Sequence, residues 1–368
     1  MTRVFVFSNI FPSYRKSIWK ELLNLKLINF TFFYSRKSHI SIGLDESLNN
    51  ENKYLNKLKH LRNFYFLGYL IWQTKVLSQV FKKVDSVIFL GEMTVITTWL
   101  ASIIYRLRGI KVIFWGHGIY GNENRIKLLL RKTFLRLANH NLVYEKRARK
   151  IMLEHGFKQN KISVVYNSIN YEQQLSLFQK LEKEKKNSIF KNNYPVLLFI
   201  GRLTKQKKIN QLIEAVKILN KKANFNLLII GEGEEKLSLE GLAQDLIKEN
   251  KCIFYGKSYD EDELSRLIYN SDLTVSPGNI GLTAIHSLSY GTPVCSHSNL
   301  CNQMPEVESI IEGENGFLFN ENDIQSIVDG IKKWFDEKKL IDKKKIREVV
   351  DKFYNPIYQK DVILKSIN

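Results

Sequence analysis

Two basic residues stand directly after an apolar run in the second half of the chain. Gly201 ends the run 195–201, and Arg202 and Lys207 follow it before a helical stretch begins. Arginine offers phosphate a planar fork of donors, and lysine offers a mobile positive charge. We therefore predict that Gly201, Arg202 and Lys207 hold a diphosphate; a solvated, lysine-rich turn is the alternative.

A histidine flanked by glycines marks a strand end in the first half. His117 follows the apolar run 111–116, and the glycine on either side leaves its imidazole uncrowded. Such a ring is typical of a group that faces a ligand, so we predict a catalytic histidine, against the alternative of a structural one. Glu92, at another strand end, and Glu123 are candidates to contact an acceptor hydroxyl.

The stretch 276–294, "SPGNIGLTAIHSLSYGTPV", has the turns and the helix of a ligand site but contains no charged residue. The backbone N–H groups at the start of a helix can bind an anion without formal charge. We predict such a helix start at Thr283. Gly231 and Gly233, in "GEG", form another glycine-rich turn, which taken alone is weak evidence for a site.

The loop after the first strand, 8–14, is predicted to face the acceptor through Pro12, Tyr14 and Arg15. Arg15 opens a helix that carries Trp19, and a cation beside an interfacial aromatic suits the headgroup region of an acidic membrane. An ordinary amphipathic first helix is the alternative.

Apolar runs alternate with helical stretches along the whole chain. Most of the runs end in glycine or another turn residue, as expected of parallel strands covered on both faces. The predicted strands are 3–8, 28–34, 86–91, 111–118, 140–145 and 161–168 in the first half and 195–201, 225–233, 251–256, 273–278 and 292–297 in the second. The alternation predicts two doubly wound parallel sheets, with ligands beyond the carboxyl ends of their strands and a cleft between the domains.

Composition suggests where the domains divide. We predict an acceptor-side domain over 1–170 and a linker over 171–194, the most polar and charge-mixed stretch of the chain. A second domain is predicted over 195–350. The tail, 351–368, reads as a helix that packs back on the first domain, with a break before Pro356.

The formal charge is unevenly distributed. Residues 1–185 have 31 Lys and Arg against 12 Asp and Glu, a net charge of +19, whereas residues 186–368 have 25 of each and a net charge of zero. A basic half beside a neutral one indicates an anionic partner for one domain only. Nucleic acid, an anionic membrane and a phosphate-rich substrate fit, as does a solvated lysine-rich surface.

Cysteine usage and apolar segments narrow the class of protein. The chain has three cysteines, Cys252, Cys295 and Cys301, with neither an even count nor metal-ligand spacing, which suggests reduced cytosolic thiols. The most apolar window, 64–72, is too short to span a bilayer, and the first residues do not read as a signal peptide.

Six motifs occur in order in the second half: "GRLTKQK", "GEG", "DLTVSP", "GNIGLTAIHSL", "GTPV" and "GENGFLF". In order and spacing they resemble glycosyltransferase family 4, nucleotide-sugar-dependent enzymes of the two-domain GT-B fold. The resemblance implies two Rossmann-like domains facing a cleft. It covers nearly the whole second half and the end of the first.

The resemblance also implies roles for particular residues. Arg202 and Lys207 match the pair that holds the donor diphosphate, and His117 resembles the histidine that approaches the donor sugar. The family's two glutamates, which bind the donor sugar and the ribose, fall on Gly278 and His286, so donor recognition is altered here. The implied donor-binding set is Gly201, Arg202, Lys207, Gly231, Gly233, Gly278, Asn279, Gly281, Leu282, Thr283 and His286.

The implied reaction is metal-independent, cofactor-free transfer of a sugar from a nucleotide sugar, with retention of configuration, to a glycan or polyprenyl-linked acceptor. A bacterial surface polysaccharide pathway (lipopolysaccharide or capsule) would place the protein in the cytoplasm, at the inner face of the cell membrane. A GT-B nucleotide-sugar epimerase is the first alternative, because fold alone does not set the reaction. A basic nucleic-acid-binding protein is the second, although the aromatic residues of the first half lie mainly in strand-like runs.

Overall fold

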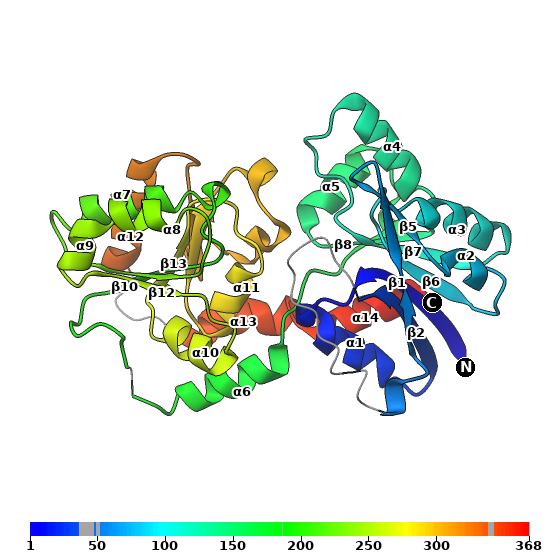
Figure 1. The fold of residues 1–368 in the computed structure, drawn as a ribbon, viewed down its shortest axis with the longest axis horizontal. Helices are drawn as coiled ribbons and strands as arrows, with labels where there is room; N and C mark the ends of the chain where they lie inside the picture. Colours follow the sequence, from blue (N-terminus) through cyan, green and yellow to red (C-terminus); the bar gives the residue numbers. More distant parts are fainter. Residues whose placement is uncertain (37–47, 49–51, 186, 338–341, 368) are drawn as a thin grey trace. The chain divides into compact units, whose positions relative to one another are not determined.

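The computed structural model describes residues 1–367 apart from 37–47, 49–51, 186 and 338–341. The chain forms two compact units, and each is an α/β unit with its own sheet (Figure 1). Unit 1 consists of Met1–Asn170 and Asn355–Asn368, and unit 2 consists of Tyr171–Tyr354.

The sheet of unit 1 contains seven parallel strands in the order β3-β2-β1-β6-β7-β8-β9. The order reverses between β1 and β6, which makes the ends of these strands the topological switch point. The strands are β1 (Thr2–Ile10), β2 (Ile28–Ser35), β3 (Leu58–Leu61), β6 (Ser86–Leu90), β7 (Lys111–Gly116), β8 (His140–Val143) and β9 (Ile162–Val164).

Helices cover both faces of this sheet, so its strands bury side chains on both sides. The helices are α1 (Lys16–Leu23), α2 (Val76–Gln79), α3 (Ile96–Leu107), α4 (Arg125–Leu135), α5 (Lys146–Glu154) and α14 (Pro356–Ile367). Helix α14 is the last helix of the chain, and Ile363 and Ile367 on it share a core cluster with Trp19 and Leu22 of α1.

Unit 2 repeats this architecture with six parallel strands in the order β12-β11-β10-β13-β14-β15. Its switch point lies between β10 and β13. The strands are β10 (Val196–Ile200), β11 (Asn226–Ile230), β12 (Cys252–Gly256), β13 (Leu273–Ser276), β14 (Val294–His297) and β15 (Gly316–Phe319). The helices are α6 (Tyr171–Leu181), α7 (Ile209–Leu219), α8 (Lys236–Leu242), α9 (Gln244–Lys248), α10 (Glu261–Tyr269), α11 (Thr283–Ser289), α12 (Ile324–Glu337) and α13 (Lys343–Phe353).

The predicted doubly wound parallel sheets are confirmed, and every predicted strand is present. Strands β3 and β15, both at sheet edges, were not predicted. The apolar window 64–72 forms most of a hairpin of β4 (Asn63–Phe66) and β5 (Leu70–Gln73), in which alternate residues of β4 are exposed. Among the described residues, no helix is both long and apolar enough to cross a bilayer.

The stretch predicted as a linker differs from the structure in part. Helix α6 occupies its first eleven residues and belongs to unit 2. Gln174, Phe178 and Leu181 are its buried residues, spaced by four and three positions along one face. The stretch is polar because the rest of this helix faces solvent.

Trp19 is not an interfacial residue, and this expectation was wrong. Its side chain is 1% exposed, and its ring stacks between Phe11 (centroids 4.0 Å apart) and Phe32 (4.3 Å). Helix α1 turns its apolar face inward, so Trp19 contributes to the core of unit 1.

Candidate functional site

The turns after β10 and β11 lie against each other at the carboxyl edge of the unit 2 sheet. Gly201 N donates a hydrogen bond to Ile230 O (3.0 Å). A Cβ atom on Gly231 would lie 1.8 Å from Gly201 O, and one on Gly233 would lie 2.2 Å from Leu203 O. Both positions therefore require glycine, because one backbone passes directly over another. The lack of side chains at Gly231 and Gly233 lets the two turns pack against each other.

Lys207 is fixed in place by the turn that follows β13. It ends the short 3-10 turn Lys205–Lys207, and its ammonium donates to Asn279 O (2.7 Å) and Asn279 Oδ1 (2.9 Å). Burial and the nearby Arg202 guanidinium lower the pKa of Lys207, while the Glu306 carboxylate raises it. A bound anion would relieve both of the unfavourable contributions.

The same edge of unit 2 carries donors that have no acceptor among the described residues. Arg202 is exposed, and its guanidinium makes no hydrogen bond or ion pair within the described part of the chain. The backbone N–H groups of residues 281–283 likewise have no acceptor among the described residues. Thr283 Oγ1 donates to Ile200 O (3.3 Å), which ties the start of α11 to the end of β10. Arg202, Lys207 and these amides thus share the switch point of unit 2.

Gly278 cannot carry a side chain in this arrangement. Its N–H donates to Lys207 O (3.1 Å), and a Cβ atom would lie 2.1 Å from Gln206 O and 2.7 Å from Lys207 Cα. The turn bearing Lys207 therefore occupies the space where a glutamate side chain would begin. Glycine at this position has a physical reason, because it lets the turn bearing Lys207 approach Asn279.

His286 is paired with a carboxylate that the sequence did not suggest. Its Nε2 lies 2.9 Å from Glu261 Oε1, at the start of α10, and the same oxygen accepts hydrogen bonds from Tyr290 (2.5 Å) and Gln174 (3.1 Å). Burial alone would raise the pKa of Glu261, but these hydrogen bonds together lower it. The carboxylate is therefore ionised at neutral pH. No described residue donates to its other oxygen, Oε2.

Because an ionised carboxylate only accepts hydrogen bonds, His286 carries its proton on Nε2. In the neutral ring this leaves Nδ1 as an acceptor. Glu261 and His286 thus hold an acceptor pair close to the start of α11, where sequence reasoning expected a histidine alone.

Glu306 is a second acidic residue of this site that sequence reasoning missed. It lies in the 3-10 turn Pro305–Ser309 and is 3% exposed. Its Oε2 would lie 3.9 Å from a Cβ atom on Gly281, and its charge acts on Lys207. Four glutamates occur between residues 306 and 314, so their spacing gave no signal that singles out Glu306.

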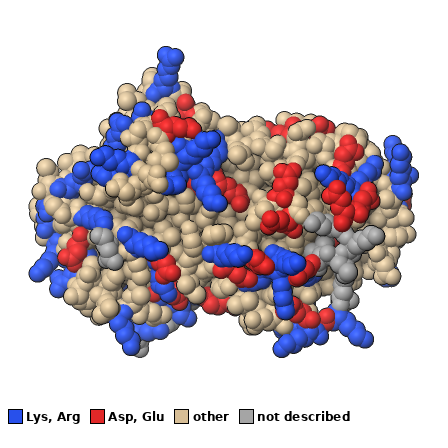
Figure 2. All heavy atoms as spheres, turned by 180° about the vertical axis from the view of Figure 1, so that it is seen from behind, with Lys and Arg blue, Asp and Glu red and all other residues tan. Residues whose placement is uncertain are grey.

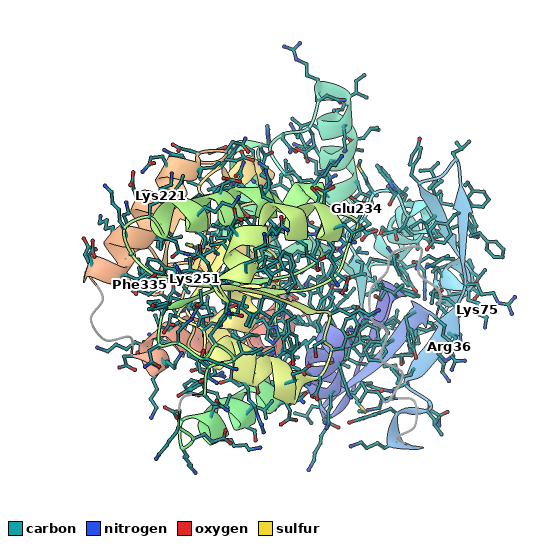
Figure 3. All side chains as sticks on the ribbon, turned by 60° about the vertical axis from the view of Figure 1, so that its left-hand side comes forward. Arg36, Lys75, Lys221, Glu234, Lys251 and Phe335 are labelled. Atoms are coloured by element: carbon teal, nitrogen blue, oxygen red, sulfur yellow. The ribbon has the colours of Figure 1, made fainter. Side chains whose placement is uncertain are left out.

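The residues described so far, from Arg202 to Glu306, all lie at the edge of unit 2 where the strands end. Figure 3 shows Glu234, in the turn after β11, at the opposite end of the unit from Lys221, Lys251 and Phe335. Lys251 directly precedes β12 and therefore marks the edge where strands begin. Ligands of doubly wound sheets bind at the carboxyl edge, which is the edge that Glu234 marks.

In unit 1, His117 lies at the carboxyl end of β7 among aromatic rings. Its ring is 4.9 Å from the Tyr144 ring, edge to face, and 5.3 Å from the Tyr120 ring, stacked. Burial, Arg15 and Arg131 lower the pKa of His117 to about 4. The imidazole is therefore neutral at physiological pH and can accept a proton or a hydrogen bond.

Arg15 lies beside this histidine but inside the unit. It is 7% exposed and donates a hydrogen bond to the Tyr144 hydroxyl. Its guanidinium carbon lies 5.0 Å from the Trp115 ring centroid and 5.6 Å from that of Tyr14. Arg15 N donates to Pro12 O (3.0 Å), which closes the turn after β1. The predicted acceptor-side loop is thus built around a cation held between aromatic rings.

The two predicted acceptor-side glutamates differ in their surroundings. Desolvation raises the pKa of Glu92, while Arg15 and a hydrogen bond from Asn9 (2.8 Å) lower it. The Glu123 carboxylate accepts hydrogen bonds from the backbone N–H groups of Tyr120 (2.9 Å) and Gly121 (2.8 Å). Its side chain is 1% exposed, so this geometry gives Glu123 a structural role in the loop after His117.

The described residues include no group of three or more His, Cys, Asp or Glu side chains placed to hold a metal ion. Cys252 and Cys295 are buried in strands of unit 2, and Cys301 is exposed.

Comparison with known sequences assigns unit 2. Residues 180–349 match the family described as "Glycosyl transferases group 1". This part of the chain is a glycosyl transferases group 1 domain. The match covers β10 to β15 and both turns of the switch point, and so it includes Arg202, Lys207 and Gly278.

Several curated proteins are similar to this chain. An uncharacterized 41.2 kDa protein in the cps region of Klebsiella pneumoniae is 31% identical over 219 residues, which are 58% of this chain and 55% of that protein. An uncharacterized glycosyltransferase of Haemophilus influenzae is 27% identical over 310 residues, 80% of each chain. The capsular polysaccharide biosynthesis glycosyltransferase CapM of Staphylococcus aureus is 26% identical over 64% of this chain and 62% of CapM. The match to the Klebsiella protein thus spans about half of that protein's length.

Solved structures share the fold along the whole chain. The lipopolysaccharide outer core galactosyltransferase WaaB in its apo form has a TM-score of 0.73 at 18% identity, with 100% of this chain and 99% of WaaB covered. HepE of Anabaena, in complex with UDP, has a TM-score of 0.69 at 15% identity, with the same coverage. These similarities confirm the predicted GT-B fold.

Proposed function

We propose that the protein is a glycosyltransferase that moves a sugar from a nucleotide-sugar donor to a glycan or lipid-linked acceptor. One observation carries the proposal: Arg202, Lys207 and the unengaged N–H groups of residues 281–283 share the switch point of a glycosyl transferases group 1 domain. A diphosphate offers the negative charge and the acceptor oxygens that this set lacks.

In the proposed reaction the bond between the anomeric carbon and the diphosphate oxygen breaks, and the acceptor oxygen bonds to that carbon. The acceptor proton passes to the leaving diphosphate, on the same face of the sugar. Arg202 and Lys207 stabilise the charge that grows on the diphosphate, which is usually the main catalytic contribution. We propose that these cations perform this task without a metal ion and that no cofactor takes part.

We propose that donor recognition depends on Gly278 and His286, the two positions in "GNIGLTAIHSL" where the resemblance places glutamates. Gly278 presents only backbone, so we propose that the donor sugar is held without a carboxylate from this position. Glu261 Oε2 and His286 Nδ1 provide acceptors near the start of α11, and we propose that they bind the ribose hydroxyls. Gly201, Gly231 and Gly233 act indirectly, by shaping the turns beneath the diphosphate.

Unit 1 supplies the acceptor side in this proposal. His117 is neutral at the pH of the cell and can accept a hydrogen bond from the reacting sugar or acceptor. Pro12, Tyr14, Arg15 and Glu92 form the turns at the switch point of unit 1, where an acceptor hydroxyl would lie. Glu123 would contribute by holding the loop that positions His117.

The similar proteins suggest a biological setting. One is encoded in a cps region, another bears a capsular polysaccharide biosynthesis name, and the WaaB structure is that of a lipopolysaccharide galactosyltransferase. We therefore propose a role in bacterial surface polysaccharide biosynthesis, as a retaining family 4 enzyme in the cytoplasm.

The test is an assay of the purified chain with a panel of nucleotide sugars and lipid-extract acceptors, in buffer with and without EDTA. We expect release of a nucleoside diphosphate together with a glycosylated product that keeps the donor's anomeric configuration, unaffected by EDTA. An epimerised nucleotide sugar with no transfer product would instead identify an epimerase, and binding to arbitrary DNA with no turnover would identify a nucleic-acid-binding protein.

A further inference from the structure

The net positive charge of the protein is confined to unit 1. This unit has 30 Lys and Arg against 10 Asp and Glu, a net charge of +20, whereas unit 2 has 26 against 27, a net charge of −1. Between residues 117 and 150 there are nine Lys and Arg and two Glu. Both glutamates are buried, since the Glu123 side chain is 1% exposed and Glu145 is 7% exposed. Figure 2 shows Lys and Arg side chains gathered over the end of unit 1 that carries α4.

Helix α4 exposes apolar side chains on its outer face. Ile126 is 75% exposed, Leu129 is 64% exposed and Leu130 is 51% exposed. Their spacing by three and four positions places them side by side on one face of the helix. Single exposed aliphatic residues are ordinary on protein surfaces, but a cluster on one helical face marks an interaction site.

Cations flank this apolar face on both sides. On a helix with 100° per residue, Lys127 falls on one side of Ile126, Leu129 and Leu130, while Arg125, Lys132 and Arg136 fall on the other. There is no Asp or Glu between residues 125 and 136. An apolar stripe edged by Lys and Arg is typical of helices that lie in the headgroup region of an anionic bilayer, where their long side chains reach the phosphates.

The inner face of α4 holds the loop that contains His117. Arg131 is 8% exposed and pairs with Glu123 (2.9 Å). Its guanidinium also donates to Gly118 O (3.3 Å) and lies 4.6 Å from the Tyr120 ring centroid. Helix α4 therefore has an outer face of apolar and cationic side chains, and through Arg131 its inner face contacts the loop that contains His117.

We propose that the outer face of α4, formed by Ile126, Leu129 and Leu130 with the flanking Arg125, Lys127, Lys132 and Arg136, docks unit 1 on an anionic lipid bilayer. The face has Lys and Arg around aliphatic side chains and no acidic residue. Its charge is therefore complementary to an anionic lipid surface, and we favour lipid over a protein partner. The proposal rests on the proposed function in one respect: docking would bring the His117 loop to a lipid-borne acceptor.

The experiment is flotation of the full-length protein with vesicles of phosphatidylcholine alone or with about 30% phosphatidylglycerol. We expect binding to the anionic vesicles only, weakened at high salt because exposed charges are then screened. The triple variant Ile126→Ser, Leu129→Ser and Leu130→Ser should lose at least tenfold in bound fraction, and Lys127→Glu should lose severalfold. Leu237→Ser, at an 83% exposed leucine of unit 2, is the matched control and should bind as the wild type does.

A triple variant that floats like the wild type would overturn the proposal, and so would a wild type that ignores anionic vesicles at low salt. Loss of binding in Phe66→Ser, on the exposed hairpin, with α4 variants unaffected would also overturn it. If the wild type is a dimer and the triple variant is a monomer, the face would be assigned to contact with a second copy of the chain instead. Nucleoside diphosphate binding, measured in parallel, separates the two proposals: vesicle binding without nucleotide binding would leave the docking surface standing and refute the proposed function.

Discussion

The two units have the same architecture, and each has polar residues at its switch point. They differ in how the arginine and lysine side chains there are partnered. In unit 2, Arg202 is exposed and has no partner among the described residues, and Lys207 has a lowered pKa. In unit 1, Arg15 is buried between aromatic rings and hydrogen-bonded to Tyr144, while Arg131 is paired with Glu123. The switch point of unit 2 thus presents cations that an anion could bind, whereas Arg15 and Arg131 near the switch point of unit 1 already have partners within that unit.

This difference suggests a division of labour. A site with unsatisfied cations binds a charged group tightly, which suits a diphosphate. A site whose cations are already satisfied leaves a neutral imidazole as the group that contacts a ligand, which suits an uncharged hydroxyl. The predictions below test this contrast between the two switch points, from the largest expected effect to the smallest.

The largest effect should come from Gly278→Glu, which adds a side chain where the turn bearing Lys207 passes closest. The new Cβ atom would lie 2.1 Å from Gln206 O, so the turn bearing Lys207 must move. We expect unfolding free energy to fall by about 3 kcal/mol, as for overpacked positions, and nucleotide binding to be lost. Chemical denaturation checks this. Gly241→Ala, in α8 with no atom within 4 Å of the added Cβ, is the control and should not destabilise the protein.

A Gly278→Glu protein as stable as the wild type would show that the turn around Lys207 adapts freely. The account of Gly278 as a packing requirement would then be wrong.

The second effect concerns Arg202. Arg202→Ala should weaken nucleoside diphosphate binding by about 2 kcal/mol, roughly thirtyfold, because a charged hydrogen-bond donor is removed. Stability should change little, since Arg202 has no partner within the described part of the chain to leave behind. Titration calorimetry measures the affinity, and Lys221→Ala, at the opposite edge of the same sheet, provides the matched control.

The third effect concerns the pair formed by Glu261 and His286. Glu261→Gln should weaken binding of a ribonucleoside diphosphate by about 1 kcal/mol and change that of its 2′-deoxy analogue less. Because the pKa of Glu261 is lowered in the folded state, its ionised form stabilises the wild type above the ordinary value of 4.5. The stability difference between wild type and Glu261→Gln should therefore shrink as pH falls below that value.

Unchanged discrimination between the ribose and deoxyribose ligands in Glu261→Gln would remove the pair from the donor site. Urea titrations at several pH values test the stability half of the prediction independently of any ligand.

The smallest effect is expected from titration of His117. With a pKa of about 4 the ring stays neutral between pH 5.5 and 8, so its protonation should change the transfer rate by less than about 10% over this range. Since the folded pKa lies below the unfolded one, stability should decrease as pH falls through 6.5 toward 4. NMR titration of the His117 ring protons checks the midpoint, and a midpoint near 6.5 would contradict the buried, cation-flanked environment.

Most of the fold was predictable because near-continuous apolar runs ending in turn residues identify buried parallel strands. Strands β3 and β15 were missed, although β9 and β12 at the opposite edges of the same sheets were predicted. In β3 the two middle residues, Lys59 and His60, are polar, so this strand does not read as an apolar run. Helix α6 was hidden by its composition, because its buried Gln174 lies on the face that would otherwise read as an apolar stripe.

The candidate site was predictable where chemistry follows a strand directly, as for Arg202 and His117. It was not predictable where partners come from distant segments. The contact between Lys207 and Asn279 spans 72 residues, and that between His286 and Glu261 spans 25. Sequence order gave no information on which of four nearby glutamates, Glu306 among them, would act on Lys207.

The central claim is that unit 2 binds a nucleoside diphosphate through Arg202 and Lys207. Titration calorimetry of the wild type and Arg202→Ala with UDP, GDP and ADP tests it most directly. We predict that the wild type binds at least one of these nucleotides, with the affinity reduced roughly thirtyfold in Arg202→Ala and unchanged in Lys221→Ala. A wild type that binds none of them, or an Arg202→Ala protein that binds equally well, would contradict the account.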